Sequence, residues 1–236
     1  MQVKKEKKVR KVNFKRIIVI LIIIVFVVSL VFIYRSLKVK NIYVIGNSYL
    51  SESEILENTN LLDYPYLYQV NENDIKNNLI NNELINSVKV SKSLSGKVTI
   101  TIEENKVLYQ ESNGKYVLSN KNEVSLLDTP LGIPSLINDC SDVRDKFIDK
   151  LQLIDKDILS HISEVEYKPT ELDKERVMFY MTDGNYVYIT LSKISLINSY
   201  NEIYPTLEGK KGILYLDSGN HFEIKEKTTI EENKTE

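Results

Sequence analysis

Few residues of this chain have side chains that could catalyse a reaction or hold a metal ion. Its 236 residues include two histidines, His161 and His221, and a single cysteine, Cys140. Neither histidine has a neighbouring His or Cys at the spacing of a zinc site, and no nucleophile motif surrounds the cysteine. No phosphate-binding loop and no G-x-G-x-x-G pattern is present. The sequence therefore predicts no metal site and no cofactor.

Paired carboxylates are the other chemistry to consider, because two of them can hydrolyse a glycosidic bond. Glu103 and Glu104 are adjacent in the sequence. Adjacent residues of a strand point to opposite faces, so these two carboxylates cannot readily flank one bond and are expected at a solvated strand end. A membrane-anchored cell-wall enzyme that uses Glu103 or Asp183 stays an alternative, although the sequence gives neither acid a defined setting.

Tyrosine is abundant, with 15 copies in a chain that has no tryptophan. Several tyrosines fall in expected strands or their connections. A tyrosine offers a large apolar ring and a hydrogen-bonding tip, which suits the recognition of a partner. Tyrosine is also a favourable strand residue for purely structural reasons. Both interpretations remain open at this stage.

The segment 212–224 is a candidate for partner binding by strand addition. Two short apolar runs flank Ser218 and Gly219, a pair typical of a turn. A short strand near the end of a sheet can pair with a strand of another protein. Structural closure of the domain is the alternative that periodicity alone favours.

The elements expected in residues 37–104 follow the order strand, helix, helix, strand, strand. Ser51 and Glu54 have the spacing of a capping box, which predicts a short helix to about residue 58. Asn71 can cap a second helix. Alternating apolar residues on both sides of Ser95 and Gly96 then predict a hairpin.

Residues 106–225 read mainly as short strands separated by turn pairs. Asp183 and Gly184 lie between two alternating segments, which is a strong hairpin signal. A polar helix is expected over 141–153. A second helix is expected to carry Ile194, Ile197, Tyr200 and Tyr204 on one face and to end at Pro205. The polar segment 226–236 is expected to be disordered.

The first 40 residues contain an apolar segment that decides on which side of a membrane these elements lie. Residues 17–34 contain no charge, and as a helix they would extend about 27 Å, close to the thickness of a bilayer's hydrocarbon core. No small-residue cleavage site follows. The sequence predicts a retained transmembrane helix, with a cleaved signal peptide and a buried core helix as the alternatives.

Charge is distributed unevenly about this segment. Eight of the 31 basic residues and one of the 33 acidic residues precede it, which leaves 23 basic and 32 acidic residues for the rest. The basic tail is expected in the cytoplasm and the acidic remainder outside. Such an acidic domain argues against nucleic-acid binding. One cysteine excludes an intramolecular disulfide, so the domain must be held by its core.

The segment from Val39 to Asn47, followed by Ser51 to Ile55, resembles the opening of a POTRA domain in the FtsQ/DivIB cell-division proteins. Asn86 to Val90 and the strand Val98 to Glu104 resemble the close of that domain. Further on, the segments at Gly132 to Pro134, 183–187 and 216–219 resemble the β domain of the family by spacing. Two departures are the absence of the usual prolines around Ser95 and at 104–106. The short tail resembles the Gram-positive branch, DivIB.

The resemblance implies an α+β fold: a single N-terminal transmembrane helix, then a POTRA domain (β-α-α-β-β) and a mixed, mainly antiparallel β domain. The expected boundaries are a basic cytoplasmic tail at 1–16, a transmembrane helix at 17–34, a POTRA domain at 37–105, a β domain at 106–225 and a disordered tail at 226–236.

The resemblance also implies a function, that of a non-enzymatic scaffold of the bacterial divisome. Its expected partners are single-span coiled-coil proteins of the FtsL and FtsB/DivIC types, and it would act beside the septal peptidoglycan synthase, at the membrane of the division septum. A POTRA-type adaptor of secretion stays an alternative. In the family the terminal strands of the β domain carry the partner contact, which implies contact residues at Ile213, Tyr215, Leu216, Ser218, Gly219, Phe222 and Ile224.

Overall fold

A computed structural model of the chain describes residues 14–126 and 130–225. The predicted basic tail lies outside the described residues up to residue 13, and the predicted disordered tail at 226–236 lies outside them entirely. The chain divides into two compact units. The first comprises Met1–Asn81 and Ser87–Ile102, and the second comprises Asn82–Asn86 and Glu103–Glu236.

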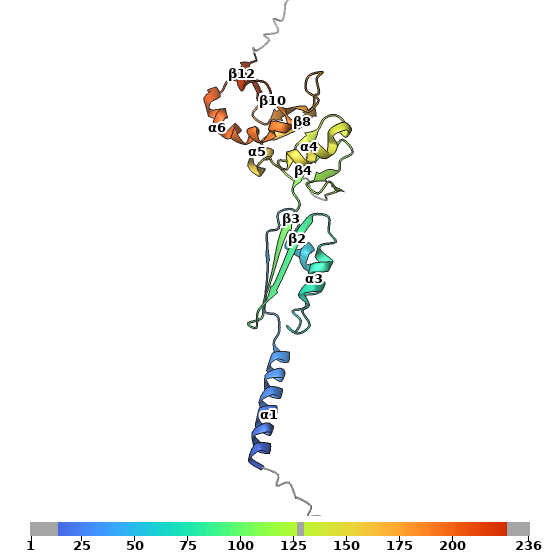
Figure 1. Cartoon of the computed structure of the whole chain (residues 1–236), viewed down its shortest axis with the longest axis vertical. Coiled ribbons are helices and arrows are strands. Elements are labelled where there is room, and N and C mark those ends of the chain that lie inside the picture. Colours follow the sequence, from blue (N-terminus) through green and yellow to red (C-terminus); the bar gives the residue numbers. More distant parts are fainter. Residues whose placement is uncertain (1–13, 127–129, 226–236) are drawn as a thin grey trace, which may run out of the picture. The chain divides into compact units, whose positions relative to one another are not determined.

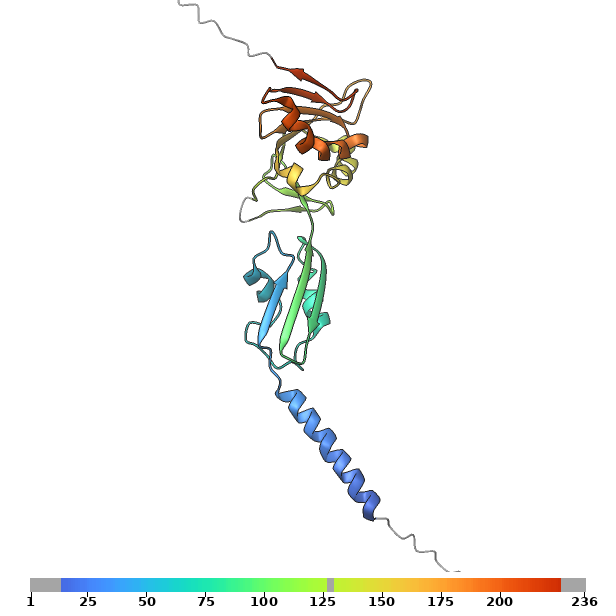
Figure 2. The ribbon, with the colours of Figure 1, turned by 90° about the vertical axis from the view of Figure 1, so that its left-hand side faces the viewer.

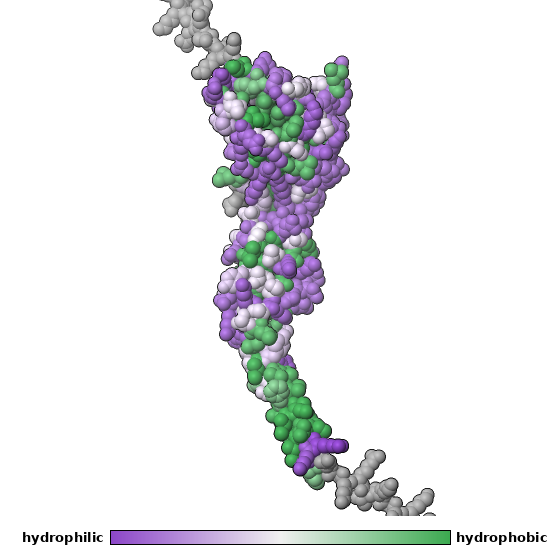
Figure 3. Space-filling view, turned by 60° about the vertical axis from the view of Figure 1, so that its left-hand side comes forward, coloured by the Kyte–Doolittle hydropathy of each residue, from purple (hydrophilic) through white to green (hydrophobic). Residues whose placement is uncertain are grey.

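The first element is a long helix, α1 (Phe14–Ser36), of 23 residues. None of its side chains is buried, and Figure 3 shows a hydrophobic surface along most of its length, with hydrophilic side chains at its N-terminal end. At 1.5 Å per residue the helix extends about 35 Å, enough to cross a bilayer. Among the described residues it is the one helix with the length and composition of a membrane span. It begins three residues before the predicted span and ends two residues after it.

The first domain has the predicted β-α-α-β-β order. Its elements are β1 (Asn41–Ile45), α2 (Glu52–Glu57), α3 (Glu72–Leu79), β2 (Ile85–Lys92) and β3 (Lys97–Glu104). The strands lie in the order β1-β3-β2, and β1 runs parallel to β3 from the pair Asn41–Lys97 to the pair Ile45–Thr101. Val98, Ile100 and Ile102 of β3 are buried on one face, together with Ile55, Ile75 and Leu79 of the two helices. Figure 1 shows α3 alongside β2 and β3.

Local sequence signals define the helix starts in this domain. Ser51 caps α2 through a complete capping box, in which its hydroxyl accepts from the Glu54 N–H and the Glu54 carboxylate accepts from the Ser51 N–H. The Asn71 side chain caps α3 by accepting from the Asn73 N–H. After β1, Gly46 has φ +92°, and a Cβ at this position would lie 2.1 Å from the Ile102 carbonyl oxygen. Only glycine fits there.

The second domain is built on a nine-stranded sheet in the order β12-β11-β10-β9-β8-β7-β4-β5-β6. Parallel pairing joins β10 to β11, β4 to β7 and β7 to β8, and the other neighbours pair antiparallel. The mixed, mainly antiparallel sheet was predicted. The strands are β4 (Val107–Gln110), β5 (Tyr116–Leu118), β6 (Glu123–Val124), β7 (Ser135–Leu136), β8 (Ile162–Tyr167), β9 (Arg176–Met181), β10 (Tyr186–Thr190), β11 (Gly212–Tyr215) and β12 (His221–Ile224).

Short helices cover one face of this sheet, as Figure 2 shows. They form the core with the inward side chains of the strands, and Phe147, Ile148 and Leu151 of α4 are completely buried there. The helices are η1 (Ser141–Val143), α4 (Arg144–Leu151), α5 (Lys156–Ser160), η2 (Leu191–Ser199), α6 (Tyr200–Ile203) and η3 (Tyr204–Leu207), where η denotes a 3₁₀ helix.

The helical segment 191–207 differs from its prediction. Most of it is 3₁₀ helix, which repeats every three residues. Ile194, Ile197 and Tyr200 follow that spacing and are buried, whereas Tyr204 is 39% exposed and leaves the shared face. Pro205 does not end the helical segment but sits in the first turn of η3, where its missing N–H costs no hydrogen bond.

Candidate partner-binding edge

The C-terminal strands β11 and β12 form one edge of the nine-stranded sheet. They pair antiparallel, with Leu214 opposite Phe222 and Tyr215 opposite His221. Among the residues that the structure describes, no strand pairs with the other side of β12. The predicted contact segment therefore ends in an open strand edge.

A buried polar network holds β11 in place. The Gly212 N–H donates to Oδ1 of Asn185 at 3.0 Å, and Nδ2 of Asn185 donates to the Tyr200 hydroxyl at 3.1 Å. The Tyr200 hydroxyl in turn donates to Asp183 at 2.7 Å. Asn185 is 1% exposed, so the network replaces the water that these groups would otherwise bind.

Gly212 leaves no room for a side chain between the two strands. A Cβ at this position would lie 2.0 Å from the Glu223 carbonyl oxygen and 2.8 Å from the Phe222 ring. No other residue fits without moving β12. The glycine thus permits the close pairing that positions the edge strand.

The seven predicted contact residues lie in different settings. Ile213 and Tyr215 are half-buried on the outer face of the sheet, and Ser218 and Gly219 are exposed in the turn. Leu216 is only 3% exposed and belongs to the core, so its side chain is not available to a partner in this conformation. Phe222 is half-buried against the core, while Ile224, on the same strand, is 53% exposed.

The backbone of β12 offers hydrogen-bonding groups on its open side. The Lys225 N–H donates to the Lys211 carbonyl at 3.0 Å, which directs it toward β11. Backbone groups alternate in direction along an antiparallel strand. Glu223 and His221 therefore also face β11, whereas the N–H groups of Phe222 and Ile224 face outward, where another strand can pair with them.

A row of stacked side chains crosses the outer face of the sheet beside this edge. The Arg176 guanidinium lies 3.8 Å from the centroid of the Tyr188 ring. Tyr188 stacks on Tyr215 at 5.4 Å between centroids, and Tyr215 stacks on His221 at 4.6 Å. The row joins β9, β10, β11 and β12, and such contacts stabilise a sheet through its side chains.

The sequence did not reveal this row, because it depends on which strands are neighbours. The available signal was the alternation of Tyr186 and Tyr188 with apolar residues, which places both on one face of β10. The parallel pairing of β10 with β11 then brings Tyr215 beside Tyr188. Here the tyrosines serve the sheet as well as presenting a surface.

The turn between β11 and β12 is anchored by Asp217. Burial opposes ionisation of this carboxyl, but hydrogen bonds from Arg176 and Ser218 and the positive charge of Arg176 together lower its pKa. Lys193 donates to the Asp217 backbone carbonyl at 2.9 Å. These contacts connect the turn to β9 and to η2.

Asp183 and Cys140, the other residues considered for catalysis, lie among groups that hold the fold together. The Asp183 carboxylate accepts from the Asn185 N–H and from the Tyr200 hydroxyl. Cys140 is 3% exposed, and desolvation, followed by the nearby Asp139, raises the pKa of its thiol to about 11. No group of three His, Cys, Asp or Glu side chains that could hold a metal ion occurs in the described part of the chain.

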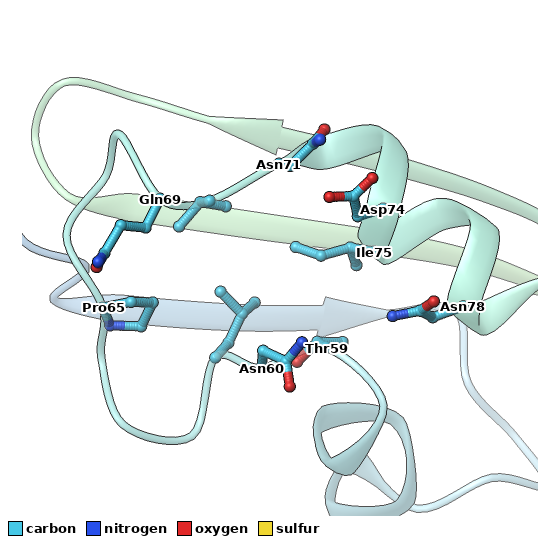
Figure 4. Close-up of a pocket in the computed structure, with 10 residues that line it drawn as sticks. Thr59, Asn60, Pro65, Gln69, Asn71, Asp74, Ile75 and Asn78 are labelled. Carbon is cyan, nitrogen blue, oxygen red and sulfur yellow. The ribbon is translucent and has the colours of Figure 1, made fainter.

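A pocket of about 300 Å³ lies in the first domain between α3 and the loop before it. Figure 4 shows the N-cap Asn71 together with Asp74 and Asn78 of α3 on one side, and Thr59, Asn60 and Pro65 of the loop on the other. Of its ten lining residues four carry amides and four are apolar, and the other two are Thr59 and Asp74. The Thr59 hydroxyl donates to the Leu56 carbonyl, so the lining shows no nucleophile paired with a base.

Comparison with known proteins agrees with this architecture. Residues 37–105 match the POTRA domain of the FtsQ type. The cell division protein DivIB of Listeria monocytogenes is 29% identical over 245 residues, which cover 100% of this chain and 90% of that protein. DivIB of Bacillus subtilis is 29% identical over 235 residues, which cover 93% of this chain and 87% of that protein.

Among the solved structures that are similar is that of the major extracytoplasmic domain of DivIB from Geobacillus stearothermophilus. It is 23% identical, covers 45% of this chain and 96% of its own, and gives a TM-score of 0.37. A similarity of this size adds nothing on the placement of individual residues.

An apolar N-terminal helix, an FtsQ-type POTRA domain and a mixed β domain define a cell-division protein of the POTRA class. Within that class the chain is similar over nearly its whole length to the DivIB proteins of the FtsQ/DivIB family, and its residues 37–105 match the FtsQ-type POTRA domain.

Proposed function

We propose that this chain is a non-enzymatic, single-span scaffold of the bacterial divisome. It binds single-span coiled-coil proteins of the FtsL and FtsB/DivIC types at the open edge of its C-terminal sheet and acts beside the septal peptidoglycan synthase. Its domains run from 37 to 105 and from 106 to 225. The open side of β12 is the observation that carries the proposal.

Charge supports the orientation of the chain in the membrane. Eight basic residues precede the apolar segment, and Arg35, Lys38 and Lys40 are the basic residues just after it. The more positive flank of a membrane span stays in the cytoplasm. The N-terminus is thus cytoplasmic and both folded domains are extracytoplasmic, at the septum.

Strand addition is the binding mode that the edge supports. The outward N–H groups of Phe222 and Ile224 give a partner strand backbone hydrogen bonds, and the exposed Ile224 side chain gives it an apolar contact. Strand edges that are open in a monomer also invite aggregation. A dedicated partner therefore both uses this edge and protects it.

The scaffold role needs no catalytic group. The Asp183 carboxylate accepts a hydrogen bond from the Tyr200 hydroxyl and so belongs to the network that holds the sheet. Cys140 is buried, and the pKa of its thiol is raised. A scaffold instead needs a firm sheet edge and a membrane anchor.

Affinity capture of the tagged full-length chain from detergent-solubilised membranes, followed by mass spectrometry, tests the proposal. Two variants of position 224 test the open backbone edge. Ile224→Pro removes an outward N–H without removing a bond to β11, whereas Ile224→Val keeps the N–H and nearly the same surface. Phe222→Glu, checked for folding, tests the apolar contact next to it.

The expected result is that the wild type and Ile224→Val recover small single-span coiled-coil proteins, whereas Ile224→Pro and Phe222→Glu do not. Recovery by all four proteins would keep the scaffold role but remove the edge as its site. If the wild type recovered no such partner, the scaffold itself would be wrong.

A further inference from the structure

The loop between α2 and α3 is tied to the chain at the point where it leaves α1. The Leu67 N–H donates to the carbonyl of Leu37, the first residue after the helix, at 2.9 Å. The Val39 N–H donates to the Pro65 carbonyl, also at 2.9 Å, and Lys38 pairs with Tyr66 as an isolated bridge. Whatever the tilt of the domain, this loop stays within hydrogen-bonding distance of the helix end.

The same loop carries exposed tyrosines. Tyr64 is 50% exposed, Tyr66 37% and Tyr68 40%. The rings of Tyr66 and Tyr68 stack at 5.7 Å between centroids, so both lie on one side of the loop. Three exposed rings in five residues form an aromatic surface that the core of the domain does not use.

The turn between β2 and β3 extends this surface. The Lys40 N–H donates to the Gly96 carbonyl at 2.8 Å, and Nζ of Lys92 donates to the Leu67 carbonyl at 3.2 Å. The turn is thereby fixed to the segment after α1 and to the tyrosine loop. Leu94 in this turn is 70% exposed. We call Tyr64, Tyr66, Tyr68 and Leu94 the tyrosine face.

Positive charges surround the tyrosine face. The Arg35 guanidinium lies 5.0 Å from the centroid of the Tyr68 ring, and the Lys38 ammonium lies 4.9 Å from that of Tyr66. Segments 35–41, 61–70 and 92–97, which build this end of the domain, contain five basic residues and a single acidic one, Asp63. This local charge contrasts with the acidic extracytoplasmic part as a whole.

We propose that the tyrosine face rests in the headgroup layer of the membrane that α1 crosses, with its cations on anionic lipid phosphates. The proposal rests on the membrane span but not on the partner edge. The headgroup layer on each side of a bilayer is about 5–7 Å thick, so a loop bonded to the first residue after the helix starts within it. Tyrosine suits this layer because its ring is apolar and its hydroxyl remains hydrated.

Docking of this kind restricts the first domain. A domain joined to a helix by a single chain would swing freely, whereas a face held by several rings and charges keeps one end of the domain on the bilayer. Cations close to an anionic lipid surface add an electrostatic attraction that salt weakens.

The chain has no tryptophan, so one substitution gives an unambiguous fluorescent reporter. Tyr68→Trp reports on the loop, and Leu94→Trp reports on the turn, which is distant from α1 in the sequence. Ile80→Trp is the matched control, because Ile80 is 41% exposed, as Tyr68 is 40%, but lies at the C-terminal end of α3. Phe32→Trp verifies that the helix is inserted.

Each full-length variant is placed in nanodiscs of phosphatidylcholine and phosphatidylglycerol whose acyl chains are brominated near the headgroup. We expect at least about a twofold loss of emission for Tyr68→Trp and Leu94→Trp, as for a residue of an interfacial belt, and little loss for Ile80→Trp. Iodide in the water should quench the control instead. Removal of the phosphatidylglycerol should weaken lipid quenching of both face reporters.

Iodide quenching of Leu94→Trp without lipid quenching would overturn the tyrosine face, even if Tyr68→Trp were quenched, because closeness to the helix would explain the latter. Equal lipid quenching of Ile80→Trp would overturn it too, since the whole domain would then lie on the membrane. If lipid did not quench Phe32→Trp, helix α1 would not be inserted in the bilayer. The proposal would then be wrong, because it rests on that span. The results for Tyr68→Trp, Leu94→Trp and Ile80→Trp do not affect the capture experiment on β12, whereas loss of the span would also contradict the single-span scaffold.

Discussion

Nε of Arg176 lies 2.6 Å from Oδ2 of Asp217, and the two side chains are only 20% and 10% exposed. This pair holds the turn that begins the edge strand. We expect Asp217→Asn to lower the free energy of unfolding by about 2 kcal/mol at neutral pH, because a hydrogen bond to a charged and partly buried group is lost. Urea unfolding of the full chain in a non-ionic detergent measures it.

The same substitution should have a pH-dependent effect. Because the native pKa of Asp217 is lowered, its contribution is complete above the ordinary carboxyl pKa and disappears as the pH falls through the native value. The difference between wild type and Asp217→Asn should therefore shrink below about pH 4. Glu208→Gln is the control, since its pair with Lys210 is exposed and should contribute almost nothing. A pH-independent difference would contradict this account.

Gly212→Ala should detach β12 from the sheet. The added Cβ would meet the Glu223 carbonyl at 2.0 Å, so one strand must move. We expect the Lys225 amide, which bonds to Lys211, to lose its protection from hydrogen exchange, and partner recovery to fall with it. Gly114→Ala is the matched control, because nothing lies near its Cβ and only its φ of +83° is strained, at a cost of about 1 kcal/mol. Retained protection at Lys225 would show that the strands tolerate the methyl group.

Two buried tyrosines should respond oppositely to loss of the hydroxyl. Tyr109 is completely buried and its hydroxyl has no hydrogen-bond partner in the described structure. Tyr109→Phe should leave stability unchanged or raise it by about 1 kcal/mol, since an unsatisfied polar group is removed while the edge contact with Phe147 remains. Thermal unfolding of the full chain measures the change.

Tyr200→Phe is the counterpart, because its hydroxyl donates to Asp183 and accepts from Asn185. Its removal leaves buried partners unsatisfied and should cost about 2–3 kcal/mol. Equal effects of the two substitutions would show that burial of the ring, not the hydroxyl, decides both positions.

Cys140 should be unreactive until the domain opens. With a pKa of about 11, its thiolate fraction at pH 8 is about two orders of magnitude below that of an ordinary cysteine, and burial adds to this. Labelling with a disulfide reagent should be slow in the native protein and rapid in urea. Rapid native labelling would mean that the segment carrying Cys140 opens readily.

Local features of the fold were predictable from the sequence. The cap at Ser51 depends on residues three positions apart, and the alternation of Val98, Ile100 and Ile102 directly reports one buried face. Strand neighbours were not predictable, because β7 has two residues and joins β4 and β8 through parallel pairs distant in sequence. The order of the sheet depends on such pairs.

The same distinction applies to the candidate site. Its hairpin followed from alternation around Ser218 and Gly219, but the burial of Leu216 and the contact of Arg176 with Tyr188 required the sheet. Helix α5 was missed because its five residues give too little periodicity. The contacts of the site with a partner stay predictions.

The parallel pairing of β1 with β3 also determines how the first domain bears a mechanical load. The chain enters the domain at the start of β1 and leaves it at the end of β3, so tension pulls these neighbouring strands in opposite directions along their length. All five paired positions from Asn41–Lys97 to Ile45–Thr101 must then shear together rather than open one by one. The first domain thus resists tension applied between its two chain ends before it unfolds.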